Sequence, residues 1–312
     1  MQQRLKTFVI LNQHAGSFDK ASGLSEIATQ NAHTALYVCQ SKDDVPSIVR
    51  QAIEEGYHTI VAGGGDGTIH EVANAMIGHF NRVRLGLIPL GTGNDFCRSF
   101  EIPTDPTEAL AMILQNEMQE RKVDLIQVEA GTKKEICVNL ISGGIGGEIE
   151  KHVDKNVKER WGALAYVRGA LSAASNLTPF QLELQIDDQE IRKLNALNIT
   201  IANGRTAGGG FEVAPHASPD DHKMDIVVVH PGNSIELAAI ATRLATGDYT
   251  KSENVSEFRA RQLRIHSYPP MDFSVDGALF ARSPIFFKLM PASLRLLTPN
   301  FSQNFNKIDR VG

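Results

Sequence analysis

The chain has 312 residues and a formal net charge of −5, and 42% of its residues are hydrophobic. This composition is ordinary for a globular protein and sufficient for the cores of two domains. The acidic balance argues against nucleic acid as a partner, and no apolar run approaches the roughly 20 residues of a membrane-spanning helix. Cys39, Cys97 and Cys137 are scattered without a CxxC pair, so the sequence predicts no disulfide framework and no zinc site, and it fits a reducing cytoplasm.

The first part of the chain alternates between apolar strands and helical segments. Two segments carry clear helix signals: Pro46 and Gly56 lie near the ends of one, and Asp105 precedes another as a cap, with Pro106 next. This alternation is typical of a parallel sheet with helices on both faces, so the sequence predicts a doubly wound α/β domain over residues 1–127. Its predicted strands are 7–12, 33–40, 59–65 and 84–90, and its predicted helices are 45–56, 67–77 and 106–115.

The pattern changes after about residue 124. The segment QLELQIDDQEI, residues 181–191, alternates around an Asp-Asp turn as a hairpin does. These features predict a second, mostly antiparallel domain over residues 128–297, a sandwich or a barrel. No Pro/Ser-rich linker lies near the boundary, so we expect the domains to pack closely. Further short strand candidates, separated by turn residues, lie at 224–230, 262–267, 271–277, 283–291 and 294–299.

Residues 154–177 differ from the rest of the second part, because their apolar residues fall on one helical face that includes Trp161. Basic residues accompany this face. The favoured interpretation is a helix packed on the sheet, and the alternative is a helix that lies on a lipid surface, where Trp and basic residues are common.

The turn GGGDGT, residues 63–68, follows a predicted strand and opens a predicted helix. Glycines without Cβ atoms let backbone N–H groups converge on an anion, and the helix N-terminus adds partial positive charge. The dinucleotide fingerprint would need glycine at Thr68, and the phosphate-binding P-loop would need a lysine that is absent. The alternative is a tight turn in which Asp66 caps the helix. Three successive glycines are costly in backbone entropy, so the sequence favours a phosphate site.

A second glycine turn, GTGNDF at residues 91–96, follows the next buried strand. Ligands of parallel sheets bind outside the carboxyl ends of the strands, so both turns are expected to line one crevice. Thr92 and Asn94 offer hydrogen bonds there, and Asp95 offers a carboxylate.

The two turns together resemble the diacylglycerol kinase catalytic domain family, the bacterial soluble lipid kinases that are related to sphingosine kinases. NAD kinases and phosphofructokinases share the Gly-Gly-Asp-Gly element, whereas GTGNDF selects the lipid branch. The resemblance covers nearly the whole chain and implies a β-sandwich as the second domain, with residues 298–312 returning to the first. Its further motifs are NQHAG at 12–16, VDL at Asp124, NLISGGIG at 139–146, NGRTAGGGFEVAP at 203–215 and VDG at Asp276.

The resemblance implies ATP as the nucleotide, with its phosphates on the first glycine turn. Asp66, Asp95 and Asp124 would form an acidic cluster that holds a catalytic Mg²⁺, partly through water, which suits the ligand preferences of this ion. Cys39 stands where the family usually has threonine. The nucleotide would be lined by Asn12, Gln13, His14, Ala15, Gly16, Cys39, Gly64, Gly65, Asp66, Gly67, Thr68, Ile69, His70 and Thr92.

The acceptor hydroxyl needs a base, and the family places Asp-Gly-Glu near the end of the second domain. Here Asp276 and Gly277 match, but Ala278 replaces the glutamate. Asp276 is the expected catalytic carboxylate, and the alternative is an Asp-Gly hairpin turn.

The family also has a structural metal site in the second domain. The matching loop would supply the carboxylate of Asp221 and the main-chain carbonyls of Ser218 and Lys223, with His222 in place of a glycine. The alternative is an ordinary surface turn.

The sequence thus predicts an ATP- and Mg²⁺-dependent lipid kinase that transfers the γ-phosphoryl group to a lipid hydroxyl, with diacylglycerol as the leading substrate and phosphatidic acid as the product. It is expected to be cytoplasmic and to touch the inner face of the membrane transiently and peripherally, with no nucleic acid partner and with a homodimer left open. The alternatives are a kinase of a soluble alcohol or nucleotide, and a nucleotide- or lipid-binding regulator that lost its base at Ala278.

Overall fold

The structure is a computed structural model that describes residues 6–144, 178–244 and 248–300. The predicted helix at 154–177 lies outside the described residues. The chain divides into two compact units, one formed by Met1–Val123 with Ala292–Gly312 and the other by Asp124–Pro291. The boundaries expected from the sequence lie a few residues further along the chain.

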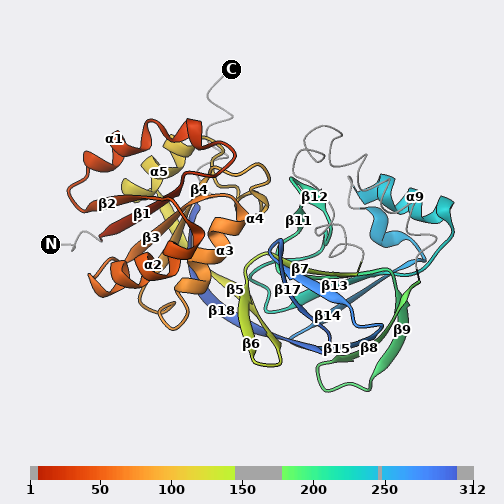
Figure 1. Ribbon diagram of the computed structural model, residues 1–312. Coiled ribbons are helices and arrows are strands. Elements are labelled where there is room, and N and C mark those ends of the chain that lie inside the picture. Colours follow the sequence, from red (N-terminus) through yellow and green to blue (C-terminus); the bar gives the residue numbers. More distant parts are fainter. Residues whose placement is uncertain (1–5, 145–177, 245–247, 301–312) are drawn as a thin grey trace. The chain divides into compact units, whose positions relative to one another are not determined.

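The first unit contains a parallel sheet with the order β2-β1-β3-β4, and the last part of β18 lies beside β4 (Figure 1). Strands of this kind are buried on both faces and therefore read as continuous apolar runs. All of β3 is buried, and in β4 only Arg84 is partly exposed. The register pairs Val9 with Val61. The strands are β1 (Thr7–Asn12), β2 (Thr34–Cys39), β3 (Thr59–Gly64), β4 (Arg84–Pro89) and β18 (Ile285–Pro299).

Helices cover both faces of this sheet. Helix α1 packs with α5, and α2 packs with α3 across the sheet from them (Figure 1). Val9 and Leu11 of β1 share a core with Leu24 of α1 and Leu110 of α5. The predicted cap is confirmed, because Asp105 Oδ1 accepts hydrogen bonds from the N–H groups of the first turn of α5. The helices are η1 (Phe18–Ala21), α1 (Leu24–Thr29), η2 (Lys42–Asp44), α2 (Val45–Glu54), α3 (Asp66–Ala75), α4 (Asp95–Ser99) and α5 (Pro106–Leu114).

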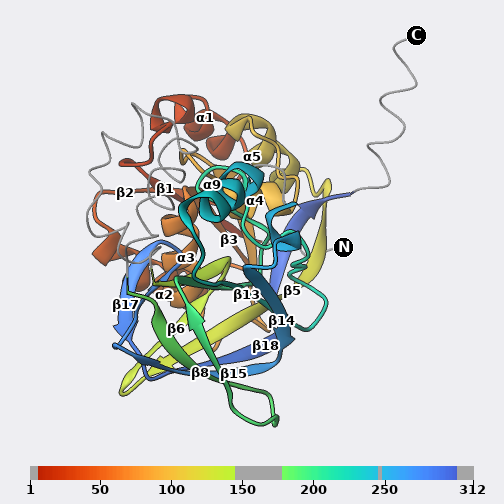
Figure 2. The ribbon, with the colours of Figure 1, turned by 90° about the vertical axis from the view of Figure 1, so that its right-hand side faces the viewer.

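The second unit is built from two layers of antiparallel strands. One layer is a six-stranded sheet with the order β14-β13-β10-β7-β16-β17. The other contains β9-β8-β15 beside the first part of β18, with β5 and β6 attached, and the strands can be followed in Figure 1 and Figure 2. The strands are β5 (Met118–Ala130), β6 (Lys133–Cys137), β7 (Leu140–Gly144), β8 (Phe180–Ile186), β9 (Arg192–Ala196), β10 (Asn198–Ala202), β13 (Met224–Val229), β14 (Val255–Ala260), β15 (Gln262–Tyr268), β16 (Asp272–Val275) and β17 (Ala278–Arg282).

The core of the second unit lies between its two layers. Alternate residues of each strand point inward, as in β15, where Leu263 and Ile265 are buried and Arg264 between them is exposed. Phe273 of one layer meets Phe287 of the other edge-on, with 5.8 Å between the ring centroids. The fold class predicted from the sequence is therefore confirmed as an α/β unit followed by an antiparallel β-sandwich.

A helix that the strand-rich pattern concealed covers part of the second unit. Helix α9 (Ser234–Arg243) begins with a capping box, in which the Asn233 side chain accepts from the first turn and the Glu236 side chain accepts from the Asn233 N–H. Its residues Leu237 and Ile240 pack on the strand β13 at Val227. Smaller elements are β11 (Thr206–Ala207), β12 (Phe211–Glu212) and η4 (Asp248–Lys251).

Within the described residues, the helices are all too short or too polar to cross a membrane.

Candidate functional site

The first glycine turn lies where β3 meets α3. Gly64 ends β3, and a Cβ atom on it would lie 2.3 Å from the Thr68 Oγ1, so only glycine fits against the first turn of α3. Asn12, at the end of β1, donates its side-chain N–H to the Thr68 hydroxyl at 3.0 Å. The carboxyl ends of β1 and β3 are thus tied together at the N-terminus of α3, where backbone N–H groups favour an anion.

The loop after β1 folds back on Asn12. The Asn12 side-chain oxygen accepts from the N–H of His14 at 2.9 Å, and its main-chain carbonyl accepts from the N–H of Ala15 at 3.0 Å. The Gln13 N–H donates to the carbonyl of Cys39 at 3.3 Å. The structure therefore brings the predicted nucleotide residues of the first two strands together at one edge of the sheet.

Cys39 is buried at the end of β2. Its thiol donates to the carbonyl of Ser41 at 2.6 Å, and burial raises the pKa of Cys39. This thiol is neutral and already has a partner, so it does not reproduce an exposed threonine hydroxyl.

The second glycine turn touches the first. A Cβ atom on Gly91 would lie 2.4 Å from the Cα of Gly65, and the Leu90 N–H donates to the Gly64 carbonyl at 2.9 Å. Asn94 has a left-handed backbone with φ of 52°. Its side chain bridges the turn, accepting from the Gly91 N–H at 2.9 Å and donating to the Gly91 carbonyl at 2.8 Å. The predicted adjacency of the two turns is confirmed.

The loop after β1 reaches the second turn as well. A Cβ atom on Gly16 would lie 2.7 Å from the hydroxyl oxygen of Thr92. Gly16 and Thr92, both predicted to line the nucleotide, are therefore neighbours in the structure.

Asp66 connects the two glycine turns electrostatically. Its Oδ2 accepts from the Asp95 N–H at 3.1 Å, and its Oδ1 accepts from the Phe96 N–H at 3.0 Å. Asp66 therefore caps α4, whereas the sequence offered it as a cap of its own helix α3, whose N-cap Gly65 makes no side-chain hydrogen bond. Local spacing could not reveal this role of Asp66, because α4 is distant from Asp66 in the sequence and adjacent to it in space.

Asp95 is buried beside Asp66, with 4% of its surface exposed. The two carboxylates lie near the thiol of Cys97, whose pKa is raised chiefly by burial and further by the charges of Asp66 and Asp95. Two of the three carboxylates predicted to hold Mg²⁺ thus lie together in the first unit.

The third carboxylate, Asp124, belongs to the second unit and is fully buried. Its Oδ2 accepts from the His222 N–H at 2.7 Å, and its Oδ1 lies 3.1 Å from His222 Nδ1. The Asp124 N–H donates to the Pro219 carbonyl at 2.7 Å. Across the described residues, no group of three or more His, Cys, Asp and Glu side chains is arranged to hold a metal ion. The three-carboxylate cluster stays a prediction.

His222 contacts the predicted site residue Asp124, and the sequence did not reveal this contact. The residue was noted only as the replacement of a glycine in the 218–223 loop, and its φ of 61° is the left-handed conformation that favours glycine. That backbone turn aims both its N–H and its ring at Asp124. The feature of the sequence that pointed to His222 was the presence of a histidine at a position where the family has glycine.

Asp221, the predicted metal carboxylate, has other partners. Its Oδ1 accepts from the Lys223 N–H at 3.0 Å, and its Oδ2 contacts the guanidinium of Arg259. The carbonyl of Ser218 accepts from the Asp221 N–H at 3.4 Å. The predicted metal loop is therefore closed by its own hydrogen bonds and by an arginine.

Asp276 occupies the turn between β16 and β17, with φ of 45°, followed by Gly277 with φ of 86°. Its carboxylate accepts from the N–H groups of Val138 at 2.8 Å, Asn139 at 2.8 Å and Leu140 at 3.0 Å. The hairpin-turn interpretation is confirmed, and the catalytic role stays a prediction.

Ala278 is exposed at the start of β17. It directly follows the Asp276-Gly277 turn, opposite Val275, so a longer side chain at this position would meet solvent.

The buried side-chain amide of Asn203 links the backbone at Asp124 with the segment that binds Asp276 inside the second unit. The side-chain N–H₂ of Asn203 donates to the carbonyls of Asp124 and Val138, at 2.8 Å each, and the N–H of Val138 reaches Asp276. The side-chain oxygens of Asn139 and Asn203 are buried without a hydrogen-bond partner in the described part of the chain. The sequence had marked both asparagines only as the first residues of motifs.

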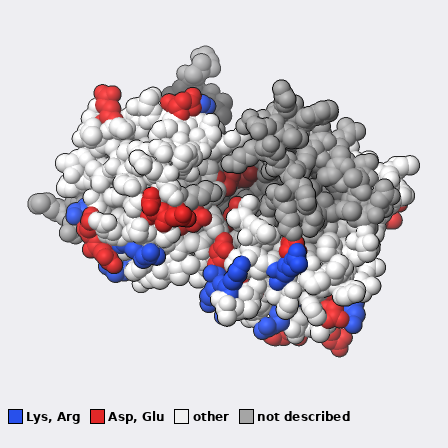
Figure 3. All heavy atoms as spheres, viewed as in Figure 1, with Lys and Arg blue, Asp and Glu red and all other residues white. Residues whose placement is uncertain are grey.

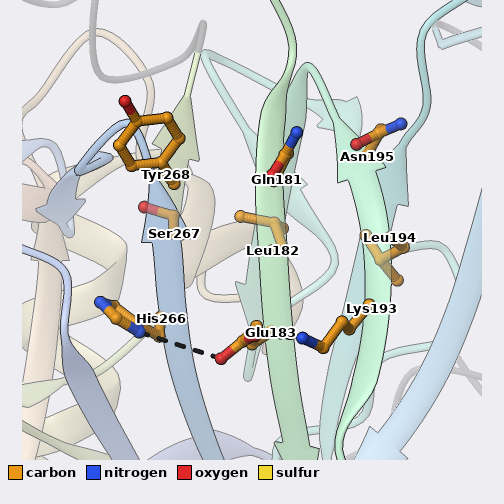
Figure 4. Close-up of a pocket in the computed structure, with 9 residues that line it drawn as sticks. All are labelled: Gln181, Leu182, Glu183, Lys193, Leu194, Asn195, His266, Ser267 and Tyr268. Carbon is orange, nitrogen blue, oxygen red and sulfur yellow. Dashed lines mark ion pairs between the residues drawn. The ribbon is translucent and has the colours of Figure 1, made fainter.

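A shallow hollow of about 440 Å³ lies on the outer face of β8, β9 and β15 (Figure 4). A row of charges crosses it, with Glu183 2.8 Å from Lys193 and 3.9 Å from His266. None of the residues predicted for the site lines this hollow.

Two family models match the chain. The diacylglycerol kinase catalytic domain matches residues 6–128, and the YegS C-terminal NAD kinase beta sandwich-like domain matches residues 139–298. The two matches together span both structural units.

Curated relatives cover most of the chain. A protein of Xanthomonas oryzae pv. oryzae (strain MAFF 311018), named "Probable lipid kinase YegS-like", is 34% identical over 263 residues, which are 82% of this chain and 84% of the relative. A "Diacylglycerol kinase" of Staphylococcus saprophyticus subsp. saprophyticus is 27% identical and covers 89% of this chain and 88% of the relative.

Solved structures share the fold. The crystal structure of a diacylglycerol kinase from Bacillus anthracis str. Sterne matches with a TM-score of 0.72 at 18% identity, covering 97% of this chain and 99% of that chain. A second structure from the same organism matches with a TM-score of 0.80 at 21% identity, covering 97% and 98%. With its two glycine turns, its sandwich and these relatives, the chain belongs to the diacylglycerol kinase catalytic domain family, together with the YegS-like lipid kinases.

Proposed function

We propose that the protein is an ATP- and Mg²⁺-dependent lipid kinase that transfers the γ-phosphoryl group to a lipid hydroxyl, with diacylglycerol as the substrate and phosphatidic acid as the product. The observation that carries the proposal is the contact between the two glycine turns, with Gly65 against Gly91 and Asp66 hydrogen-bonded to the second turn. The names of the relatives agree with it.

Backbone groups of the first unit would bind the phosphates of the nucleotide. The N-terminus of α3 and the glycine turn before it present N–H groups to an anion, and the close approach of Gly64 to Thr68 leaves no Cβ atom in the way. Asn12 and Thr92 flank this turn through their contacts with Thr68 and Gly16. These contacts support the nucleotide positions expected from the sequence.

The residues near the turn suit Mg²⁺, because the ion prefers carboxylate oxygens and water. Asp66 and Asp95 of the first unit would hold it. When bound, the ion neutralises charge that develops on the transferred phosphoryl group. Asp66 is held in one orientation by two N–H donors, so it is positioned before the nucleotide arrives.

We assign to Asp276 the role of general base towards the lipid hydroxyl. Three backbone N–H groups hold its carboxylate in one orientation in the β16–β17 turn. A general base contributes on the order of 10²–10⁴-fold to such a transfer. Since Ala278 supplies no second carboxylate, we expect slow turnover.

Access to the lipid would occur by transient, peripheral contact with the inner face of the membrane from the cytoplasm. On the face viewed in Figure 3, basic and acidic side chains form small separate groups, so attraction to anionic lipid would be local. Nucleic acid is not an expected partner, and a homodimer stays open.

The second candidate is a nucleotide- or lipid-binding regulator, which Ala278 favours. It would bind ATP without transferring phosphate. A kinase of a soluble alcohol or nucleotide is the third candidate and has no structural observation in its favour.

The test is transfer of labelled phosphate from ATP to a panel of lipids in vesicles, compared with water-soluble alcohols and nucleotides. We expect labelled phosphatidic acid from vesicles that contain diacylglycerol, with Mg²⁺ required. Full turnover of a soluble acceptor without a response to vesicles would overturn the proposal. ATP binding by calorimetry, with no labelled lipid, would favour the regulator.

A further inference from the structure

The loop at residues 218–223 can be tested for its fit to a structural metal ion. Such a site would use the Asp221 carboxylate as its charged ligand, because Mg²⁺ and Ca²⁺ take oxygen ligands that include at least one carboxylate. In the structure this carboxylate contacts the guanidinium of Arg259 and accepts from the Lys223 N–H at 3.0 Å. A guanidinium beside the same oxygens repels a second cation, so the arrangement does not fit a metal ion.

Arg259 is placed at the loop by the register of the sheet. It lies directly opposite Asp225 in the antiparallel pairing of β13 with β14. Its Nε is 3.4 Å from Asp225 Oδ1, while its terminal nitrogen reaches Asp221. One guanidinium therefore spans two carboxylates, one on the strand and one on the loop.

Asp225 shows why a cation is needed at this position. Only 5% of Asp225 is exposed, and its Oδ2 has no hydrogen-bond partner in the described part of the chain. A buried carboxylate without a compensating charge is costly, and Arg259 is the cation that faces it.

Among the described groups near Asp225, Asp221 and Glu257 add negative charge, and His216 opposes that charge less than Arg259 does. Glu257, on the same strand as Arg259, adds negative charge, and its carboxylate is 4.0 Å from the His216 ring. Asp221 and Asp225 therefore share one arginine in an acidic surrounding. Removing that arginine would leave a pair of carboxylates that could recruit a divalent cation.

We propose that Arg259 is a built-in cation that takes the place of a metal ion in the 218–223 loop. The loop is then closed by the protein itself, with Arg259 between Asp221 and Asp225. Because the same loop carries His222, the contact of His222 with Asp124 also forms without a divalent cation at this position.

The test measures folding, so it is independent of the proposed kinase activity. Thermal unfolding is followed without nucleotide, first in EDTA and then with millimolar Mg²⁺ or Ca²⁺. The 218–223 loop of the wild type is expected to bind neither ion, so any shift of the wild-type Tm with an ion should persist in Asp221→Asn. Arg259→Gln is expected to lower the Tm by several degrees in EDTA, and millimolar Ca²⁺ or Mg²⁺ is expected to restore part of the loss by binding the folded state.

Matched variants locate the effect. Arg282→Gln breaks a comparable cross-strand pair with Asp272 in the same sheet, and it should not create a response to ions. The double variant Arg259→Gln, Asp221→Asn should lose the response of the single variant. If Arg259→Gln does not fold, Asp221→Asn alone serves, since it should lower the Tm equally with and without ions.

The proposal is overturned if the wild type gains stability from either ion and Asp221→Asn abolishes that gain, because the loop would then hold a metal. A wild-type gain that persists in Asp221→Asn but disappears in Asp66→Asn comes from the first unit and agrees with the proposal. The proposal is also overturned if Arg259→Gln has the same Tm as the wild type in EDTA and its Tm does not change when either ion is added.

Discussion

Gly65 and Gly91 lie in backbone contact, so close that a Cβ atom on Gly91 would be 2.4 Å from the Gly65 Cα. The two residues belong to turns at the ends of β3 and β4, which are paired in parallel register. Each turn would be weak evidence by itself. Their contact makes one surface out of two short motifs, and this surface is the basis of the proposed nucleotide site.

Gly91→Ala should damage both folding and ATP binding. Its methyl group would overlap backbone and the Asn94 side-chain oxygen, which cannot move aside without opening the turn. We expect a loss of about 1–3 kcal/mol in the free energy of unfolding, as for other overpacked sites. Denaturant unfolding and calorimetric titration with ATP measure the two effects.

Gly23→Ala is the matched control for that change. Gly23 has φ of −85°, and a Cβ atom on it would make ordinary contact with the Thr107 methyl group at 3.4 Å. The control should keep both ATP binding and stability. Normal ATP affinity in Gly91→Ala would contradict the assignment of the turns to the nucleotide.

Asp66→Asn should reduce phosphoryl transfer at least about 100-fold if Asp66 helps hold the metal ion. The amide can present one oxygen to the N–H groups of Asp95 and Phe96, so some stability is also lost. Steady-state kinetics at several Mg²⁺ concentrations measure the catalytic effect, and the apparent Mg²⁺ requirement should rise.

Asp105→Asn provides the comparison, because Asp105 caps α5 of the same unit and is not among the residues predicted to bind the nucleotide or the metal ion. Asparagine caps a helix about as well as aspartate, so activity and Mg²⁺ dependence should stay normal. Equal kinetics for Asp66→Asn and Asp105→Asn would remove Asp66 from the mechanism.

Asp276→Asn should cost about 1–3 kcal/mol in the free energy of unfolding, because the amide leaves one of the backbone donors at Val138, Asn139 or Leu140 unsatisfied. Activity measured well below the Tm of the variant should also fall. Full activity per folded molecule would show that Asp276 only shapes the turn.

Ala278→Glu tests the missing carboxylate directly. Ala278 is exposed, so the change should alter the free energy of unfolding by less than about 0.5 kcal/mol. A carboxylate at this position is expected to raise the rate of lipid phosphorylation by about tenfold or more, as a better-placed base. Ala278→Gln, which has the same size without the charge, should give no gain.

The pair of Arg295 with Glu120 ties β18 to β5 in the first unit, with nitrogen–oxygen distances of 2.8 and 2.7 Å. The hydrogen bonds and charge of Arg295 lower the pKa of Glu120. A carboxyl group whose pKa is lower in the folded state than in the unfolded state stabilises the fold at pH values above its unfolded-state pKa. This stabilisation is lost as the pH falls through its folded-state pKa. Arg295→Gln should therefore cost about 1 kcal/mol near neutral pH, and the difference from wild type should shrink as the pH falls below about 4.

Lys193→Gln is the control for that prediction, because its partner Glu183 and Lys193 itself are well exposed. Its effect on the free energy of unfolding should be smaller than that of Arg295→Gln. A constant difference between Arg295→Gln and wild type from neutral to acidic pH would contradict the role of the ion pair.

Local patterns predicted most of the first unit, whereas α1 and the sandwich strands β5, β6, β7, β10, β14 and β17 were not among the predicted elements. The helices α2, α3 and α5 and the strands of the parallel sheet appear within a few residues of their expected positions. The helix α9 was not predicted, although Asn233 and Glu236 have the spacing of a capping box. The short helix α4 was missed as well, since five residues carry no periodicity and its cap is supplied by Asp66.

The sequence alone determined the two glycine turns at strand ends, the carboxylates near them and the change from α/β to β structure, because each depends on neighbouring residues along the chain. Only the tertiary structure decided which partners those carboxylates have. Asp66 reaches α4, Asp124 reaches His222, and Asp221 reaches Arg259 across the strand pairing of the sandwich. Such contacts depend on sheet order and register, which bring distant residues together and which no local spacing encodes.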